Sequence, residues 1–169
     1  MIETIKFKDD IYPILQTQGF AAQYAFPFAK HICIGRGFDI GYGKTEWKLP
    51  GAVGIDLANH DEWHAMNLPE GEIDYIFSSH CLEHLDNWVE ALEYWISRLK
   101  IGGNLFLYLP HRTQQYWKPF NNRKHIHALD GDLIKECLEK LNMGNIFLSS
   151  YDLNNSFYII GEKFELNNI

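Results

Sequence analysis

Cysteine is scarce in this sequence, and the few cysteines lie far apart. Cys33, Cys81 and Cys137 form no closely spaced pair of the kind that a zinc site or a redox couple uses. Residues 1–10 carry charges where a signal peptide needs an apolar run, and no stretch approaches the ~20 apolar residues that span a bilayer. We therefore expect a soluble, cytoplasmic protein with reduced, mostly buried thiols and no membrane partner.

Basic residues are outnumbered by acidic ones. The chain has 15 Lys and Arg against 22 Asp and Glu, a formal net charge of −7, which argues against a nucleic-acid partner bound through a broad basic face. Internal repeats and Pro/Gly/Ser-rich linkers are also missing, and 169 residues that are 46% hydrophobic supply one core. We predict a single domain over residues 1–169, with 1–34 as a lid or packing segment and 35–165 as the core. The oligomeric state is not predicted by any feature of the sequence.

Apolar runs of strand length alternate with segments of helical period. The runs expected to form strands are 37–41, 52–55, 73–77, 105–109, 146–148 and 157–160. Near-continuous apolar strands suit a sheet that is covered on both faces, which usually means parallel strands. A turn-prone segment, Asp152–Asn155, separates the last two runs and predicts a hairpin there.

Two helices are legible between these runs. Apolar side chains form one stripe from Trp88 to Leu99, Asn87 and Glu90 resemble a capping box at its start, and Gly102-Gly103 predicts its end. A second helix covers 133–141, with Asp130 or Gly131 at its cap. The order of elements predicts an α/β fold: a mostly parallel, Rossmann-like sheet with a C-terminal antiparallel hairpin and helices on both faces.

Glycines and polar side chains follow the predicted strands. Ligands of open parallel sheets bind beyond the carboxyl ends of the strands, where strand order reverses. The candidates at those ends are Asp39 with Gly41 and Gly43, then Asp56, then His80 with Glu83 and His84, then His111. Asp56 directly follows the second strand, where a carboxylate can accept hydrogen bonds from both hydroxyls of a nucleoside ribose. An aspartate that caps a turn is equally compatible with this position.

The glycine pattern disfavours a dinucleotide. A dinucleotide site needs G-x-G-x-x-G at the start of a helix that faces the pyrophosphate. Here Glu46 stands where the third glycine belongs, and Pro50-Gly51 interrupts before an ordinary helix could form. A nucleoside without phosphate, with a cationic centre and an amino-acid tail, suits this acidic turn better, and S-adenosylmethionine fits that description.

Several motifs, in order, resemble those of class I S-adenosylmethionine-dependent methyltransferases of the small-molecule, type-11 branch. Residues 37–43 resemble the first motif and 53–56 the ribose-binding motif, while 68–85 resemble the "LPF…FD…SxxLEH" signature and 99–110 the "LKPGG…P" strand. The resemblance implies that Asp39, Gly41 and Gly43 surround the methionine part of the cofactor and that Asp56 holds the ribose. The resemblance also implies that Leu57 flanks the adenine and that Ala65 and Met66 approach the rim of the adenine. It further implies that Ser79 and His80 lie near the methyl group that is transferred.

Two departures from the family pattern leave a second reading open. The helix after the first motif is nearly absent, so that a wall of the pocket has to come from elsewhere, such as residues 44–47. His64 stands where the family has an acidic residue for the adenine amino group. A non-catalytic, methyltransferase-like domain that binds a partner is the alternative from another class.

The segment His80-Cys-Leu-Glu83-His84 also satisfies H-x-x-E-H, the inverted zinc-peptidase signature. That chemistry needs both histidines on one helix face as ligands and Glu83 as general base. His80 is expected on the strand-to-helix turn, and a downstream glutamate ligand cannot be identified. We therefore assign no metal ligand, keep a zinc hydrolase as a minor alternative, and expect Glu83 and His84 to tie the turn to the sheet edge.

The acceptor is expected to be a small molecule, such as a sugar or another metabolite with a free hydroxyl. Methyl transfer is an in-line displacement, and a hydroxyl nucleophile benefits from a histidine base. His111, directly after its strand, and His80 are the candidate bases, with a solvated or capping histidine as the other reading. Residues 112–127 are the one locally basic stretch and are interleaved with aromatics, which suits a loop that contacts the acceptor, although a plain surface loop has the same composition.

Overall fold

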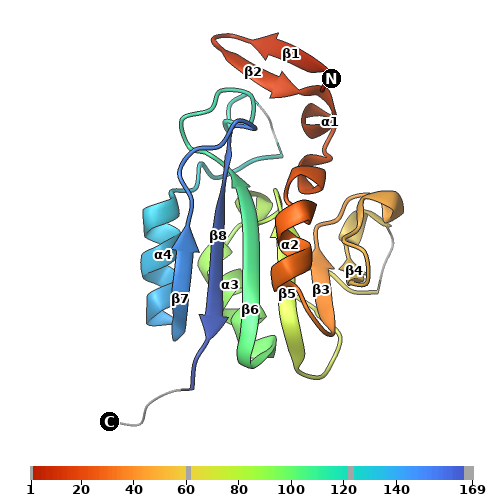
Figure 1. Cartoon of the computed structure of the whole chain (residues 1–169), viewed down its shortest axis with the longest axis vertical. Helices are drawn as coiled ribbons and strands as arrows, with labels where there is room; N and C mark the ends of the chain where they lie inside the picture. The colour runs from red at the N-terminus through yellow and green to blue at the C-terminus, as the bar shows by residue number, and fades with distance from the viewer. Residues whose placement is uncertain (1, 60–61, 122–123, 166–169) are drawn as a thin grey trace.

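The computed structural model describes residues 2–59, 62–121 and 124–165 (Figure 1). The strands are β1 (Thr4–Phe7), β2 (Asp10–Pro13), β3 (Gly37–Ile40), β4 (Val53–Ile55), β5 (Ile73–Ser79), β6 (Leu99–Pro110), β7 (Met143–Leu148) and β8 (Ser156–Lys163). The α-helices are α1 (Ile14–Thr17), α2 (Phe26–Ile32), α3 (Trp88–Arg98) and α4 (Gly131–Lys140). Short 3₁₀ helices are η1 (Ala21–Tyr24), η2 (Thr45–Trp47), η3 (Leu57–Asn59) and η4 (Leu82–His84).

The main sheet has six strands in the order β4-β3-β5-β6-β8-β7. Strands β4, β3, β5 and β6 are parallel, and β8 runs antiparallel to both of its neighbours, β6 and β7. The predicted mostly parallel sheet with a C-terminal antiparallel hairpin is confirmed. The chain leaves β3 for β4 on one side and returns to β5 on the other, so strand order reverses at β3 and ligands are expected beyond this edge.

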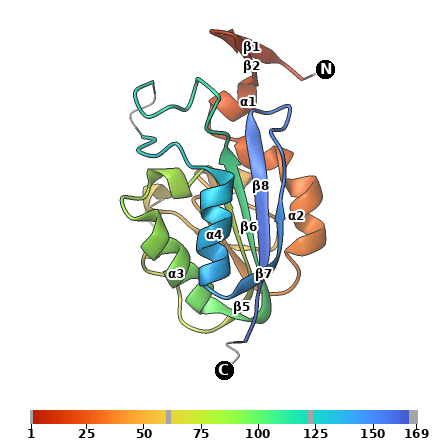
Figure 2. The same ribbon diagram turned by 90° about the vertical axis from the view of Figure 1, so that its left-hand side faces the viewer.

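Helices cover both faces of the sheet, as predicted, with α3 and α4 on one side and α2 on the other (Figure 2). Side chains alternate along β5, so that Ile76 packs in the cluster under α3 and α4, which includes Trp95. Its neighbour Phe77 packs on the opposite face with Ala25 and Phe106. Small alanines at the N-terminal helices let their backbones approach this aromatic face of the sheet closely.

The two long helices, α3 and α4, are each capped at the N-terminus by the side chain of the residue directly before the helix. The Asn87 side chain accepts a hydrogen bond of 3.3 Å from the Glu90 amide, which confirms the predicted start of α3. The Asp130 side chain accepts one of 3.0 Å from the Asp132 amide, so Asp130 rather than Gly131 is the N-cap of α4. Both caps satisfy amides that have no partner within the helix.

The prediction that Gly102 and Gly103 end the helix is wrong. Helix α3 ends at Arg98, because Leu99 already pairs with Ile73 as the first residue of β6. The register then shifts before Asn104 pairs with Tyr75. Gly102 has a φ of +79°, and a Cβ on Gly103 would lie 2.9 Å from the Lys100 carbonyl oxygen. The two glycines therefore allow the irregular start of β6.

The N-terminal residues form a hairpin that the sequence did not predict. Strands β1 and β2 pair antiparallel and lie beyond the carboxyl ends of the parallel strands, next to the loop that follows β6 (Figures 1 and 2). The Tyr12 hydroxyl accepts hydrogen bonds from the amides of Gln115 (2.9 Å) and Tyr116 (3.1 Å) and donates one of 2.6 Å to Asp10. The hairpin is therefore tied to the loop that follows β6.

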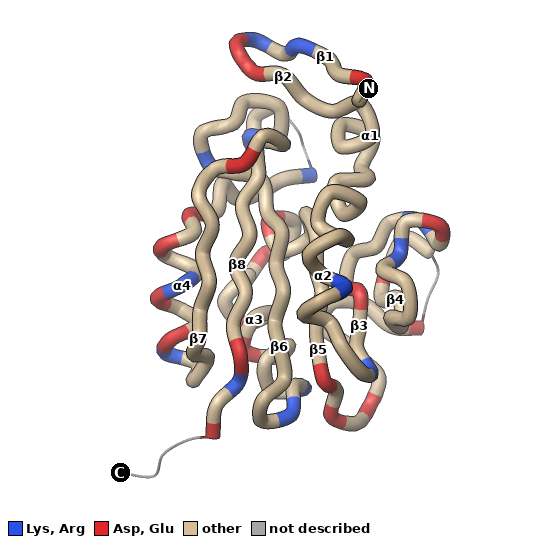
Figure 3. The backbone as a smooth tube through the Cα atoms, in the orientation of Figure 1, with Lys and Arg blue, Asp and Glu red and all other residues tan. Residues whose placement is uncertain are grey.

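Charged residues of both signs are interspersed along the drawn chain, and neither sign gathers on a single element (Figure 3). The three cysteines are free and partly buried. Within the described residues, every helix is too short or too polar to cross a membrane.

Candidate functional site

A cavity of about 750 Å³ opens beyond the carboxyl ends of β3, β4 and β5. Its walls come from the turn after β3, the residue after β4, the turn after β5, the N-terminal segment and the loop after β6. The lining residues are Gln16–Gly19, Ala21, Gly41, Gly43, Trp47, Asp56, Ala58, His80, Cys81, His84, Trp117, Lys124 and His125. The cavity thus lies where strand order reverses, as expected for a ligand site of an open sheet.

Two positions of the turn after β3, Gly41 and Gly43, require glycine for steric reasons. Gly41 has a φ of +83°, and a Cβ there would lie 2.5 Å from the Cβ of Cys81. Gly43 has a φ of +76°, and a Cβ there would lie 3.4 Å from the Trp47 ring. Both positions need glycine for their backbone conformation, and Gly41 also needs it for the close approach of the turn after β5.

Asp56 is half-buried on the cavity wall and is held from two sides. Its Oδ2 accepts a hydrogen bond of 2.7 Å from the Gly43 amide, and its Oδ1 accepts one of 2.7 Å from the Ala58 amide. Asn59 adds a 2.7 Å bond from its Nδ2 to the Gly43 carbonyl oxygen. Each carboxylate oxygen keeps a further lone pair, so this fixed carboxylate can still accept hydrogen bonds from a ligand diol.

Asp39 lies on β3, before the glycine turn, and is not among the residues that line the cavity. Its side chain is 1% exposed, and Oδ2 accepts a 2.6 Å hydrogen bond from the Leu49 amide. Burial raises the pKa of the Asp39 carboxyl to about 7. This carboxyl therefore fixes the segment after the glycine turn through the Leu49 amide.

The segment after the first motif forms only the 3₁₀ turn η2 in place of a regular helix. Trp47, at the end of this turn, lines the cavity and stacks on Phe20 with ring centroids 5.2 Å apart and an angle of 7°. The Lys44 ammonium lies over the same indole, 4.3 Å from its centroid. Trp47, supported from behind by Phe20 of the N-terminal segment, thus lines the cavity on the side of η2.

The remaining residues that the family resemblance implied are not among those that line the cavity. Leu57 is 73% exposed on η3, directly after Asp56, and Met66 is 39% exposed. The Ala65 carbonyl oxygen accepts a 2.7 Å hydrogen bond from the Trp95 indole. Ser79 is buried, and its hydroxyl has no hydrogen-bond partner among the described residues.

The two candidate bases lie in separate places. His80 lines the cavity with a φ of +48°, on the turn after β5 as expected, and its Nε2 is 3.1 Å from the Ser156 hydroxyl. His111 lines another depression, beside Arg112 and Tyr151, and its Nδ1 is 2.7 Å from the Thr113 hydroxyl. Burial lowers the pKa of both imidazoles, and the lowering is large for His80.

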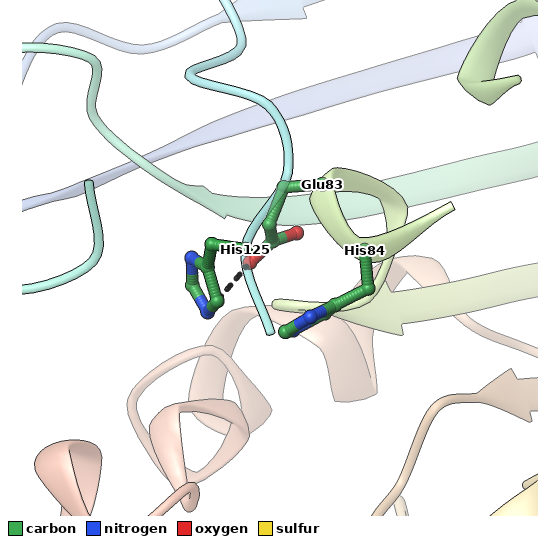
Figure 4. Close-up of side chains that lie close together, drawn as sticks. All are labelled: Glu83, His84 and His125. Carbon is green, nitrogen blue, oxygen red and sulfur yellow. Dashed lines mark ion pairs between the residues drawn. The ribbon is translucent and has the colours of Figure 1, made fainter. Parts of the chain in front are cut away.

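The turn after β5 carries a buried carboxylate between histidines (Figure 4). Glu83 is fully buried, with Oε1 3.8 Å from His80 Nδ1 and 3.8 Å from His125 Nε2. Burial raises the pKa of Glu83 to about 8 and lowers that of His125 to about 3. His84 packs edge-on against His125, with ring centroids 4.3 Å apart.

Several lining residues were not identified as site residues from the sequence, among them Gln16, Trp117 and His125. The aromatic, basic composition of 112–127 signalled a loop near the site, although Asn122 and Arg123 of that stretch lie outside the described residues. Gln16 gave no signal, because its place depends on hydrogen bonds from its Nε2 to Asn154 O (2.6 Å) and Ser156 Oγ (3.0 Å), far along the chain.

Solved methyltransferase structures share this fold. A SAM-dependent methyltransferase from Thermotoga maritima, described as a possible histamine N-methyltransferase, is 18% identical, with a TM-score of 0.68 over 88% of this chain and 92% of that one. A SAM-dependent methyltransferase from Archaeoglobus fulgidus is 18% identical, with a TM-score of 0.64 over 88% and 98%. Human N-acetylserotonin methyltransferase, in complex with SAM, is 12% identical, with a TM-score of 0.63 over 89% and 54%.

None of the curated proteins matches the sequence. A family model described as a methyltransferase domain matches residues 17–146, which is most of the chain and includes every wall of the cavity except Gln16. The family resemblance drawn from the sequence motifs is thereby confirmed. The chain belongs to the methyltransferase-domain family and has the fold of the class I S-adenosylmethionine-dependent methyltransferases.

Proposed function

We propose that this chain transfers a methyl group from S-adenosylmethionine to a small, polar molecule in the cavity beyond β3, β4 and β5. The observation that carries the proposal is the Asp56 carboxylate, which the amides of Gly43 and Ala58 hold on the cavity wall. A cavity of about 750 Å³ is also within the range of small-molecule sites, roughly 300–1,000 Å³.

The chemistry of the donor set fits this cofactor. The oxygens of Asp56 suit the two ribose hydroxyls, and the exposed Leu57 offers an apolar surface for the adenine. The open backbone of Gly41 and Gly43 leaves room for the amino-acid tail. A pyrophosphate would meet no helix N-terminus at this turn, because η2 is a single turn of 3₁₀ helix with Glu46 in it.

Bound S-adenosylmethionine supplies an electrophilic methyl group on a sulfonium. The chain's own residues have to hold the acceptor in line with that group and exclude water, since alignment is the main source of rate in such displacements. Part of the cavity wall is made by Gln16 from the N-terminal segment and by Trp117 and Lys124 from the loop after β6. We assign this wall to the acceptor.

The acceptor wall favours a ligand with a hydroxyl or amino group. The Oε1 of Gln16 is buried and has no hydrogen-bond partner among the described residues, while its Nε2 is fixed by two bonds. An acceptor group that donates a hydrogen bond to this oxygen would satisfy it. Trp117, which is 5% exposed, adds apolar surface to this wall, which suits a sugar or a planar ring.

A base role for His80 or His111 stays a prediction. Of the two, His80 lies on the cavity wall, but its ring nitrogens already face Ser156 and Glu83. His111 lies beside the other depression and could reach only an acceptor that extends out of the cavity.

Isothermal titration with S-adenosylmethionine and S-adenosylhomocysteine tests the proposal. Asp56→Ala should weaken binding by about 1–3 kcal/mol, because a hydrogen-bonded charge is lost. Glu136→Gln, which removes one exposed negative charge on α4, is the matched control and should bind as the wild type does. Absence of heat with both nucleosides would refute the cofactor assignment.

Turnover separates the enzyme from the alternative function. A panel of hydroxyl- and amine-bearing small acceptors, assayed with radiolabelled methyl donor, should yield labelled product. Tight binding of S-adenosylhomocysteine with no product from any acceptor would support a non-catalytic, methyltransferase-like binding domain instead.

A further inference from the structure

Glu83 has an unusual environment for a carboxylate. It is 0% exposed, and neither of its side-chain oxygens has a hydrogen-bond partner among the described residues. A buried polar group without a partner costs free energy, and a buried charge without a partner costs far more. The groups that face Glu83 from η4, the turn before it and the loop after β6 are the imidazoles of His80, His84 and His125.

The hydrogen bonds of His84 fix which of its nitrogens carries the proton. Its Nδ1 lies 2.5 Å from the carbonyl oxygen of Lys124. A carbonyl oxygen can only accept, so Nδ1 is the protonated nitrogen and donates this bond. The Nε2 of His84 therefore presents a lone pair.

The same reasoning applies to His80. The Ser156 hydroxyl has one hydrogen, which it donates to the carbonyl oxygen of Asn154 at 3.2 Å, and it accepts a bond from Gln16 Nε2. In the 3.1 Å hydrogen bond between His80 Nε2 and the Ser156 hydroxyl, the imidazole is therefore the donor. The Nδ1 of His80 then carries a lone pair, and it lies 3.8 Å from the Glu83 carboxylate oxygen.

Potential metal-ligand atoms of three side chains converge on one point. Ligand atoms of Glu83, His84 and His125 all lie within 4.8 Å of one another (Figure 4). Two ligands that are each about 2.0–2.1 Å from a tetrahedral zinc ion lie about 3.4 Å apart. The observed separation of 3.8 Å between Glu83 Oε1 and His125 Nε2 is within a few tenths of an ångström of that value.

We propose that Glu83, His84 and His125 bind one divalent transition-metal ion, with zinc as the ion that this donor set suits best. Two imidazoles and one carboxylate are a common set for a zinc ion that keeps a further position open. His84 and His125 line the cavity, so the open position faces the ligand space. The Lys124 carbonyl that orients His84 is the outer partner that a metal-binding imidazole usually has.

This site differs from the peptidase reading of the H-x-x-E-H pattern. Its Glu83 is a ligand, because a fully buried carboxylate has no access to a water that it could activate. The third ligand is His125 from the loop after β6, where sequence reasoning sought a downstream glutamate. An ion here joins η4 to that loop and stabilises the ionised form of the Glu83 carboxyl, independently of any methyl transfer.

The site is tested with full-length, tag-free protein in the absence of nucleoside and acceptor. After dialysis against a chelator, the protein should bind one equivalent of Zn²⁺ in isothermal titration, and Co²⁺ should give the intense visible absorption of a four-coordinate site. His84→Gln and His125→Gln should each weaken Zn²⁺ binding by at least the 10–100-fold that outer-sphere changes cause. His31→Gln, an exposed histidine on α2, is the control and should bind as the wild type does.

Two results would overturn the proposal. One is a wild-type protein, folded by circular dichroism, that binds neither Zn²⁺ nor Co²⁺. The other is unchanged affinity in both His84→Gln and His125→Gln. If Glu83→Gln fails to fold, the two histidine variants and the cobalt spectrum of the wild type still decide the question, and none of these readouts depends on the cofactor.

Discussion

The backbone amide of Gly43 donates a 2.7 Å hydrogen bond to Oδ2 of Asp56, which joins the turn after β3 to the end of β4. The carboxylate therefore does not need to be ordered when a ligand arrives. Preorganised acceptors of this kind lose little conformational entropy on binding. The bond also means that a change in the glycine turn reaches Asp56 directly.

Gly41 and Gly43 should respond differently to alanine. Both have a positive φ, which costs an L-residue about 1–2 kcal/mol, so Gly43→Ala should lower the free energy of unfolding by about that amount. Gly41→Ala also places a Cβ 2.5 Å from that of Cys81, and overpacking adds about 1–3 kcal/mol. Urea unfolding of the two variants measures the difference, and equal losses would contradict the steric role of Cys81.

Trp47 should matter for cofactor binding, because it forms the wall that replaces the missing helix. Trp47→Ala removes the ring that stacks on Phe20 and should weaken S-adenosylhomocysteine binding about tenfold, or about 1.4 kcal/mol. Trp47→Phe keeps an aromatic ring there and is the control, with an expected change below about threefold. Titration calorimetry of both variants checks this; wild-type affinity in Trp47→Ala would show that the wall lies elsewhere.

The core fold was predictable because its signals are local. Long apolar runs in the sequence predict β5 and β6, and the apolar stripe from Trp88 to Leu99 predicts α3. The β1–β2 hairpin was missed because β1 alternates between exposed and half-buried residues and only the last two residues of β2 are buried, so no apolar run marks it. The glycine pair after α3 was misread, because a helix end and an irregular strand start both favour residues with a positive φ.

The candidate site was predictable only where one short segment carries it. Asp56 and Gly41 each follow a strand directly, and position alone indicated them. Gln16 and His125 reach the cavity through contacts with segments far along the chain, which hydrophobic periodicity does not encode. Tertiary structure alone could bring His125 to Glu83 and place His111 at another depression.

The Tyr12 hydroxyl should control the mobility of the loop after β6. Tyr12→Phe leaves the Tyr116 amide without its partner, while the Gln115 amide keeps a 3.0 Å bond to Asp10. We expect a loss of about 1–3 kcal/mol in stability and faster hydrogen–deuterium exchange at residues 115–117.

Tyr94→Phe is the matched control for this loop. It removes a 2.9 Å bond of the same kind, from the Leu68 amide to the Tyr94 hydroxyl, on α3. Exchange at 115–117 should stay at the wild-type rate in this variant. Equal exchange in Tyr12→Phe and wild type would show that the hairpin does not restrain the loop.

Asp39 should make stability fall between mildly acidic and neutral pH. Burial raises the pKa of its carboxyl from 3.8 to about 7, so the folded state binds more protons than the unfolded state in that window. Its stabilising contribution is thus fully present below about pH 4 and is lost as the pH rises through 7, at about 1.4 kcal/mol per pH unit. Asp39→Asn cannot ionise and should be stabilised relative to wild type at pH 8 far more than at pH 5.

Urea unfolding of wild type and Asp39→Asn at both pH values isolates this effect, because every other titrating group is common to the two proteins. The Leu49 amide can still donate to the asparagine oxygen, so the fold of the turn is expected to persist. Asp132→Asn, at an exposed position on α4, serves as the control for the change of charge. If the difference in stability between Asp39→Asn and wild type is the same at pH 5 and pH 8, the carboxyl of Asp39 titrates outside this window and its burial does not set the pH dependence.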